Sequence, residues 1–415
     1  MIPITIPIGS GRANPAVQCS ATELQLLVSS RKRLQEWISA RDFAGYDPYD
    51  VLNSPYLAKG IARTWPINIL LIQIGRRFVG ERLRRWLDVP VSKNPKTLGL
   101  LLSALCDLSQ CGEDVRRVTM SLKGDLAQLR SPDREFCCWG YNFDFFSARG
   151  PAMLAFRPNA IATYFCAQGL LDMAETFYDV GAREMAESAA RFFQQRLNRS
   201  VDEPDKLCFS YTPDNHSVIY NSSALVAAFL ARLSRLSGGT ETRDLSRRAM
   251  NFLVASQRPD GSWLYGNESR QRWIDHFHTG YNLCALLDYM EQCDDRSFEA
   301  SLVKGYEFYI QHLFDATGAP KYFHNSLYPI DIHSCSQAIL TLLAFADRDP
   351  SGQERAIRTA LWTIRNMQAP EGFFYFQRHR CWTNRTAFMR WGQAWMLHAL
   401  ARLECAIRAV KQSPV

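Results

Sequence analysis

Four aspartates and three histidines lie just before, or at, the start of segments with helical periodicity. The aspartates are Asp144, Asp214, Asp275 and Asp331, and the histidines are His216, His278 and His333. Carboxylates and imidazoles are common general acids and bases, and two carboxylates that flank a glycosidic bond are enough to hydrolyse it. An Asp in this place can instead be an N-cap that accepts backbone N–H groups. Asp275 is the strongest functional candidate, because Trp273, His276 and His278 surround it in the sequence.

Aromatic and basic residues recur in the same long loops. A sugar offers flat apolar faces and a ring of hydroxyl groups, so aromatic rings with a few converging polar groups suit it. Arg385 and Arg390 could pair with the carboxylate of a uronic acid or with a phosphate. We therefore predict one site with a catalytic set and a substrate-binding set. The catalytic set is Asp144, Asp275, His278, Asp331 and His333, and the binding set is Trp139, Tyr141, Asp214, His216, Trp263, Tyr328, Arg385, Arg390 and Trp391.

Metal binding is an alternative use of the three histidines, because imidazole is a common zinc ligand. The twelve cysteines are scattered, apart from the pair Cys137 and Cys138, and no pair of CxxC motifs is present to build a structural zinc site. We therefore predict no metal and no cofactor. We also expect free, buried thiols, as in a reducing cytosol.

The elements that must position these residues are helices, because no alternating strand pattern stands out. From about residue 96 onward the helical segments come in pairs, with a short link inside each pair and a long loop between pairs. The first helices of successive pairs begin near Asn159, Asn221, Thr279, Ser334 and Met389. This interval of roughly 55–60 residues is one helical hairpin plus a long loop. The spacing predicts an all-α toroid of the (α/α)6 type, whose long loops meet at one end, which we call the mouth.

The N-terminal part stands outside this repeat. We divide the chain into residues 1–95, an N-terminal helical segment that packs on the barrel, and residues 96–415, the toroid, within one structural unit. Helices are expected near residues 23–40 and 61–86. The turn-forming motif GYDPYD at residues 45–50 either folds over the mouth and adds Asp47 or Asp50 to the site, or clasps the barrel wall.

The net charge of +7 is unevenly distributed. Basic residues crowd the region 76–96, directly after an apolar stretch, and such a segment can lie on an anionic membrane surface or form a core helix with a solvated edge. Nucleic-acid binding has no further support in the sequence. The first fifteen residues do not read as an export signal, so we expect a cytoplasmic location, with possible peripheral contact to the inner membrane.

Two family resemblances bear on this interpretation. Residues Gln257 to Trp263 resemble the QW motif of triterpene cyclases, which implies an α/α barrel; a cyclase would also need an acidic DxDD cluster, and the sequence has none. Five motifs in order, at residues 45–50, 138–141, 275–280, 328–333 and 389–396, resemble a bacterial family associated with exopolysaccharide or capsule biosynthesis, the VpsJ-like group. More distantly, the barrel is similar to glucuronyl C5-epimerases and to six-hairpin glycosidases and lyases.

The leading hypothesis is an enzyme that acts on a bacterial polysaccharide or its lipid-linked precursor. Hydrolysis, elimination and C5-epimerisation stay open, with Asp275 as the expected acid or base. The first alternative is a non-catalytic glycan-binding or scaffold component of polysaccharide assembly. The second is a terpene-type cyclase, which the missing acidic cluster argues against.

Overall fold

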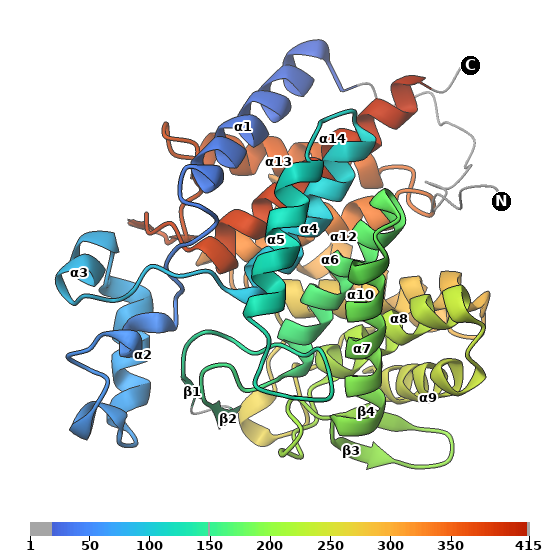
Figure 1. The fold of residues 1–415 in the computed structure, drawn as a ribbon. Coiled ribbons are helices and arrows are strands. Elements are labelled where there is room, and N and C mark those ends of the chain that lie inside the picture. Colours follow the sequence, from blue (N-terminus) through green and yellow to red (C-terminus); the bar gives the residue numbers. More distant parts are fainter. Residues whose placement is uncertain (1–18, 148–149, 413–415) are drawn as a thin grey trace.

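The helices form a closed double ring in the computed structural model, which describes residues 19–147 and 150–412 (Figure 1). The inner helices are α4 (Pro95–Gln110), α6 (Ala160–Phe177), α8 (Tyr220–Ser237), α10 (His276–Cys293), α12 (Ile332–Ala344) and α14 (Ala394–Gln412). Each inner helix contacts the next, and α14 closes the ring against α4. The outer helices are α5 (Arg116–Gln128), α7 (Val180–Arg191), α9 (Thr240–Ala255), α11 (Glu299–His312) and α13 (Gly352–Met367). The predicted all-α toroid is confirmed.

The N-terminal helix α1 (Ala21–Ser39) takes the sixth outer place, because it packs against both α13 and α14. Its start is fixed by a capping box, in which Ser20 and Glu23 satisfy each other's backbone N–H groups. The ring is therefore completed by a helix from the opposite end of the chain.

Inner and outer helices differ in the faces that they bury. α6 is buried on almost every side and is mostly apolar, whereas α13 buries one stripe and exposes Glu354, Arg358 and Arg365. α4 and α6 approach closely at Gly99 and Gly169, where an added Cβ would lie 2.3 Å from a backbone oxygen of the other helix. The inner ring is therefore a packed core rather than an open channel.

Short antiparallel strands occur in loops that lead from an outer helix to the next inner helix, so they lie at the mouth. They are β1 (Phe145–Ser147) with β2 (Gly150–Met153), β3 (Arg199–Asp202) with β4 (Leu207–Phe209), and the sheet of β5 (Ile330–Asp331), β6 (Gln377–Arg378) and β7 (Thr383–Asn384). Two π-helical turns, Phe192–Arg196 and Met389–Gln393, and a 3-10 turn, Ser269–Gln271, complete these connections.

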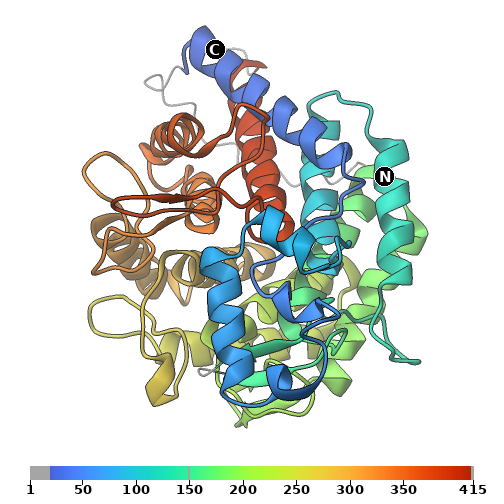
Figure 2. The same ribbon diagram turned by 90° about the vertical axis from the view of Figure 1, so that its left-hand side faces the viewer.

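The segment between α1 and α4 lies across the mouth. It contains η1 (Asp50–Asn53), η2 (Gly60–Arg63), α2 (Ile67–Phe78) and α3 (Glu81–Trp86), and Figure 2 shows it in front of the ring. Its ends are fixed by backbone bridges from Gly45 to Ser92 and from Tyr46 to Phe388. In the described part of the chain, no helix has both the length and the apolar composition needed to cross a bilayer. The N-terminal residues that we read for an export signal lie outside the described residues.

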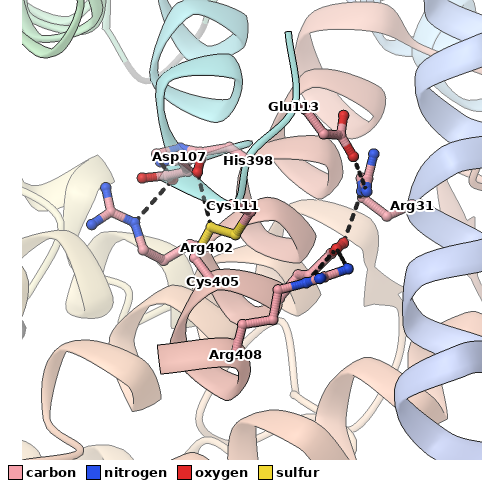
Figure 3. The surroundings of a disulfide bond; sticks show 9 residues. Arg31, Asp107, Cys111, Glu113, His398, Arg402, Cys405 and Arg408 are labelled. Carbon is pink, nitrogen blue, oxygen red and sulfur yellow. Dashed lines mark hydrogen bonds and ion pairs between the residues drawn. A yellow bond between two sulfur atoms is a disulfide. The ribbon is translucent and has the colours of Figure 1, made fainter. Parts of the chain in front are cut away.

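A disulfide lies at the end of the ring opposite the mouth (Figure 3). It joins Cys111, which follows α4, to Cys405 of α14, with 5.9 Å between their Cα atoms. Arg31 of α1 pairs with Glu113 and Glu404 beside it. The expectation of free thiols was wrong for these two cysteines, because ring closure brings together residues 294 positions apart. The other ten cysteines form no disulfide; eight of them are buried as expected, but Cys284 is half-buried and Cys381 is exposed.

Candidate active site

Asp275 is the N-cap of α10 and holds the ring of His278. Its Oδ1 accepts a hydrogen bond from the backbone N of His278 at 2.9 Å. Its Oδ2 lies 2.7 Å from His278 Nδ1 and 2.7 Å from the indole Nε1 of Trp273. Because a carboxylate only accepts, this contact places the imidazole proton on Nδ1 and leaves the lone pair on Nε2. The His278 side chain is 20% exposed, and no described residue hydrogen-bonds its Nε2.

Aromatic rings enclose the His278 imidazole. Tyr265 lies 4.5 Å from it between ring centroids and stacks on Trp273 at 4.4 Å. Tyr281 follows three residues after His278 on α10, and their ring centroids are 5.9 Å apart. Phe277 closes another side at 4.1 Å. The imidazole therefore has one orientation and an aromatic surrounding.

Asp331 is the equivalent N-cap on the next inner helix, α12. Its Oδ1 accepts from the backbone N of His333 and from Trp391 Nε1, both at 2.9 Å, and its Oδ2 accepts from Gln377 at 2.6 Å. Burial raises the pKa of Asp331. Nevertheless, both of its oxygens are occupied as acceptors, so this carboxyl group is built into the wall of the mouth.

His333 is buried beside this cap. Its Nε2 lies 2.6 Å from the hydroxyl of Tyr281, its ring stacks on Phe277, and its Nδ1 has no partner among the described residues. Burial, and then the charge of Lys96, hold the pKa of His333 well below its ordinary value. The imidazole is therefore neutral, and it can polarise the Tyr281 hydroxyl.

The motif at residues 45–50 folds over the mouth, which is the first of the two interpretations considered from the sequence. The Asp47 carboxylate accepts hydrogen bonds from Nε and Nη2 of Arg390, at 2.6 and 2.9 Å, and both side chains are buried. Asp50 pairs instead with Arg84, and its other oxygen accepts a hydrogen bond from the backbone N of Asp47 at 2.7 Å. Arg390 was predicted to bind a uronate or phosphate. That prediction does not fit, because Asp47 already occupies its guanidinium fork.

Two further cations reach the mouth that sequence reasoning did not assign to the site. The Arg76 guanidinium of α2 lies 5.8 Å from the ring centroids of Tyr49 and of Trp391. Burial alone would lower the pKa of Arg76, but Tyr49, Tyr322 and Asp331 raise it above the ordinary value, so it stays charged.

Lys96, in the first turn of α4, is the second cation. Its Nζ lies 4.2 Å from the ring centroid of Phe165 and 5.2 Å from that of Trp395, and no described carboxylate lies within ion-pair distance. Burial, followed by the charge of Arg390, lowers the pKa of Lys96 well below its usual 10.5. The only feature of the sequence that could have indicated Lys96 as a site residue is that it is a lone lysine at the start of a mostly apolar helix.

Trp139 and Trp263 do not fit the stacking role predicted for them. Both are buried, with 0% and 1% exposure, and each indole N–H donates to an outer-helix carbonyl, that of Leu126 or Leu253, at 2.9 Å. Neither ring has a free face for a sugar. Both tryptophans anchor a long loop to the preceding outer helix.

The structure brings together about half of the predicted residues. Those that meet at the mouth are Tyr141, Asp275, His278, Asp331, His333, Arg390 and Trp391. Tyr141 is buried under the Arg390 guanidinium, and its hydroxyl lies 3.2 Å from that of Tyr211. Tyr328 is half-buried and packs against the core.

The remaining predicted residues have partners outside this cluster. Asp144 pairs with Arg63 and accepts from the backbone N of Ala155. Asp214 is exposed and pairs with Arg157. His216 is exposed beside Asn198, and Arg385 is exposed over the ring of Tyr375. Among the described residues, no group of three or more His, Cys, Asp or Glu side chains is placed to hold a metal ion.

Comparison with known proteins gives likeness of fold and not of sequence. No family model matches the chain, and no curated protein matches it. The resemblance to the exopolysaccharide group therefore stays a prediction.

Among solved structures, the chain is similar to a GH76 α-mannanase from Bacteroides thetaiotaomicron, with TM-score 0.59, 12% identity and coverage of 77% of this chain and 87% of the other. It is similar to cellobiose 2-epimerase from Bacillus thermoamylovorans, with TM-score 0.61, 11% identity, and coverage of 78% and 90%. A possible GH105 member from Salmonella enterica gives TM-score 0.59, 11% identity, and coverage of 96% and 97%. The chain therefore shares the α/α-toroid fold of these proteins.

Proposed function

We propose that the protein is a carbohydrate-processing enzyme in which His278, oriented by Asp275, takes a proton from a sugar bound at the mouth. The observation that carries the proposal is the Asp275–His278 pair. Its carboxylate fixes the imidazole tautomer, and the imidazole nitrogen with the lone pair has no partner among the described residues. This arrangement assigns the proton transfer to His278 and makes Asp275 the positioning residue.

Proton transfer at a sugar carbon, in epimerisation or elimination, suits this site better than hydrolysis by two carboxylates. Hydrolysis needs one carboxylic acid to protonate the leaving group and a second carboxylate as nucleophile or base. Asp275 and Asp331 are both buried caps whose oxygens already accept hydrogen bonds. In our proposal neutral His333 donates its Nε2–H to the Tyr281 oxygen, which leaves the hydroxyl proton free for the sugar, so Tyr281 serves as the acid that opposes His278.

A sugar is the substrate class that we infer from the walls of the mouth. Tyrosine and tryptophan rings there can contact the apolar faces of a pyranose, and the charged Arg76 favours an acidic group on it. A mannanase and a cellobiose 2-epimerase have the same fold, which supports a carbohydrate. We extend the proposal to a bacterial exopolysaccharide or its lipid-linked precursor as substrate, with the protein in the cytoplasm.

The test is hydrogen exchange into the sugar. The protein is incubated with acidic and neutral oligosaccharides in D2O, and ring positions are followed by NMR. We expect deuterium at one ring carbon, or an unsaturated product, in the presence of wild-type protein and not of His278→Gln. The control is His312→Gln, on the exposed surface of outer helix α11.

Two results would count against the proposal. Release of a new reducing end without exchange would indicate hydrolysis. Saturable binding of an oligosaccharide with neither exchange nor product, in wild type and both variants alike, would favour the glycan-binding alternative.

A further inference from the structure

The molecule concentrates its exposed apolar side chains on one segment. Of the sixteen large hydrophobic residues exposed in the described chain, nine lie between positions 56 and 91. Six of these nine form the surface discussed below, and their side chains are 41% to 77% exposed: Ile61, Trp65, Leu70, Ile74, Phe78 and Trp86. We name this surface the α2–α3 face. Exposed apolar patches of this kind mark interaction sites in soluble proteins.

The α2 helix has two faces with different surroundings. Leu70, Ile74 and Phe78 follow one another at intervals of four, so they form one stripe along the outside of the helix. On the inner side Ile72 is buried, and Arg76 reaches the mouth. These three side chains are 41% to 70% exposed, Phe78 beside the ring of Trp382, and Figure 1 shows α2 and α3 at the edge of the molecule, to one side of the ring.

The charges that remain exposed on this face are mostly positive. The predicted basic region is smaller than its sequence suggested, because Arg84 pairs with Asp50, Lys93 pairs with Asp125, and Lys96 turns into the ring. Arg77, Arg82 and Arg85 are exposed at the surface. Of the nearby acids, Glu81 is half-buried, and Asp88 is exposed and accepts a hydrogen bond from Tyr56, so three exposed arginines stand against one exposed carboxylate.

We propose that the α2–α3 face binds the surface of an anionic lipid bilayer. An amphipathic helix with an apolar stripe and flanking arginines inserts into the boundary between headgroups and acyl chains. Tryptophans are enriched at that boundary, and the exposed Trp65 and Trp86 lie just before α2 and at the end of α3. The arginines favour anionic over zwitterionic headgroups.

This placement also gives the mouth a position relative to the membrane. α2 separates the bilayer from the site, because its outer stripe contacts lipid and its inner Arg76 contacts Trp391. The headgroup of a lipid-linked glycan could then reach the mouth along α2. This last step rests on the proposed function, whereas the binding to the bilayer does not.

The experiment is co-sedimentation of the full chain with vesicles. One set contains phosphatidylglycerol and phosphatidylcholine, and the other contains phosphatidylcholine alone. The variant is Leu70→Gln, Ile74→Gln and Phe78→Gln together, which keeps good helix formers on an exposed stripe. The matched control is Val118→Gln, Val180→Gln and Val303→Gln, exposed valines of the outer helices α5, α7 and α11.

We expect wild type and the control to bind the anionic vesicles, and the α2 variant to bind at least about tenfold more weakly. Arg77→Gln, Arg82→Gln and Arg85→Gln together should remove the preference for the anionic set. Equal binding of the α2 variant and wild type would overturn the proposal, as would wild-type binding no greater than background. Self-association of wild type that the α2 variant abolishes, without vesicle binding, would make the face a contact between copies instead.

Failure of this proposal is separable from failure of the proposed function. The α2 variant should retain exchange activity on soluble oligosaccharides, and an unchanged melting temperature shows that it is folded. His278→Gln should lose that activity and still bind the vesicles.

Discussion

Asp275→Asn separates the two tasks of this side chain. Asparagine is as good an N-cap as aspartate, so its oxygen can still accept from the backbone N of His278. The other oxygen becomes an NH2 group, which then faces two donors, Trp273 Nε1 and His278 Nδ1, both 2.7 Å from the present oxygen. An indole can only donate, so its bond to Asp275 is lost while the amide oxygen keeps the cap; in the flipped orientation the NH2 group would instead face the backbone N–H of His278, and the cap would be lost.

The magnitude follows from these bonds. Asp275 is 2% exposed, and replacing a buried acceptor oxygen with an NH2 group that faces two donors costs about 1–3 kcal/mol of the free energy of unfolding. His278 can regain a bond only by moving its proton to Nε2, so that Nδ1 accepts from the new amide. That change removes the lone pair that would take the proton from the sugar. The same exchange in a Ser-His-Asp triad lowers kcat by about 10⁴, and we expect a loss of about 10³- to 10⁴-fold here.

The assay observes the tautomer directly and needs no substrate. Long-range ¹H–¹⁵N NMR of histidine-labelled protein should show the Nδ1–H form of His278 in wild type and the Nε2–H form in Asp275→Asn. Asp331→Asn is the matched control, because Asp331 caps α12 in the same way but does not touch His278. Full exchange activity in Asp275→Asn, or an Nε2–H tautomer in wild type, would refute the reasoning.

Three other substitutions test the surroundings of the site. Lys96→Met should stabilise the protein. Between the lowered pKa of Lys96 and 10.5, the folded wild-type protein binds fewer protons than its unfolded chain, so its free energy of unfolding rises with pH. The stability advantage of the variant should therefore shrink by about 1.4 kcal/mol per pH unit as the pH approaches 10.5. An advantage in denaturant unfolding that does not vary with pH would contradict this. Asp47→Asn should cost about 3–5 kcal/mol, because it leaves the buried Arg390 charge uncompensated, and urea unfolding measures it. Trp263→Phe should cost about 1–3 kcal/mol through the lost bond to Leu253 and leave KM unchanged; a raised KM with unchanged stability would restore the stacking role.

Much of the fold was predictable because helical periodicity and capping are local. The interval between hairpins indicates a repeating helical architecture, and an Asp directly before an inner helix can satisfy free backbone N–H groups wherever that helix packs. Asp275 and Asp331 were accordingly foreseen both as caps and as residues of the mouth. The short spacing from Asp275 to His278 also determined their hydrogen bond, because both groups lie within one helical turn.

The tertiary structure decided which side chains are free. Asp47 and Arg390 are 343 positions apart, and only closure of the ring makes them partners. The same packing leaves Lys96 without a carboxylate within ion-pair distance among the described residues and buries Trp139, and the outer stripe of α2 stays exposed. A sequence pattern indicates which face of a single helix is apolar. The partners of each side chain and its burial depend on which distant elements pack against that face. The sequence by itself therefore determined the toroid and the end at which its site lies, and the packed ring determined which of the candidate groups are available for chemistry.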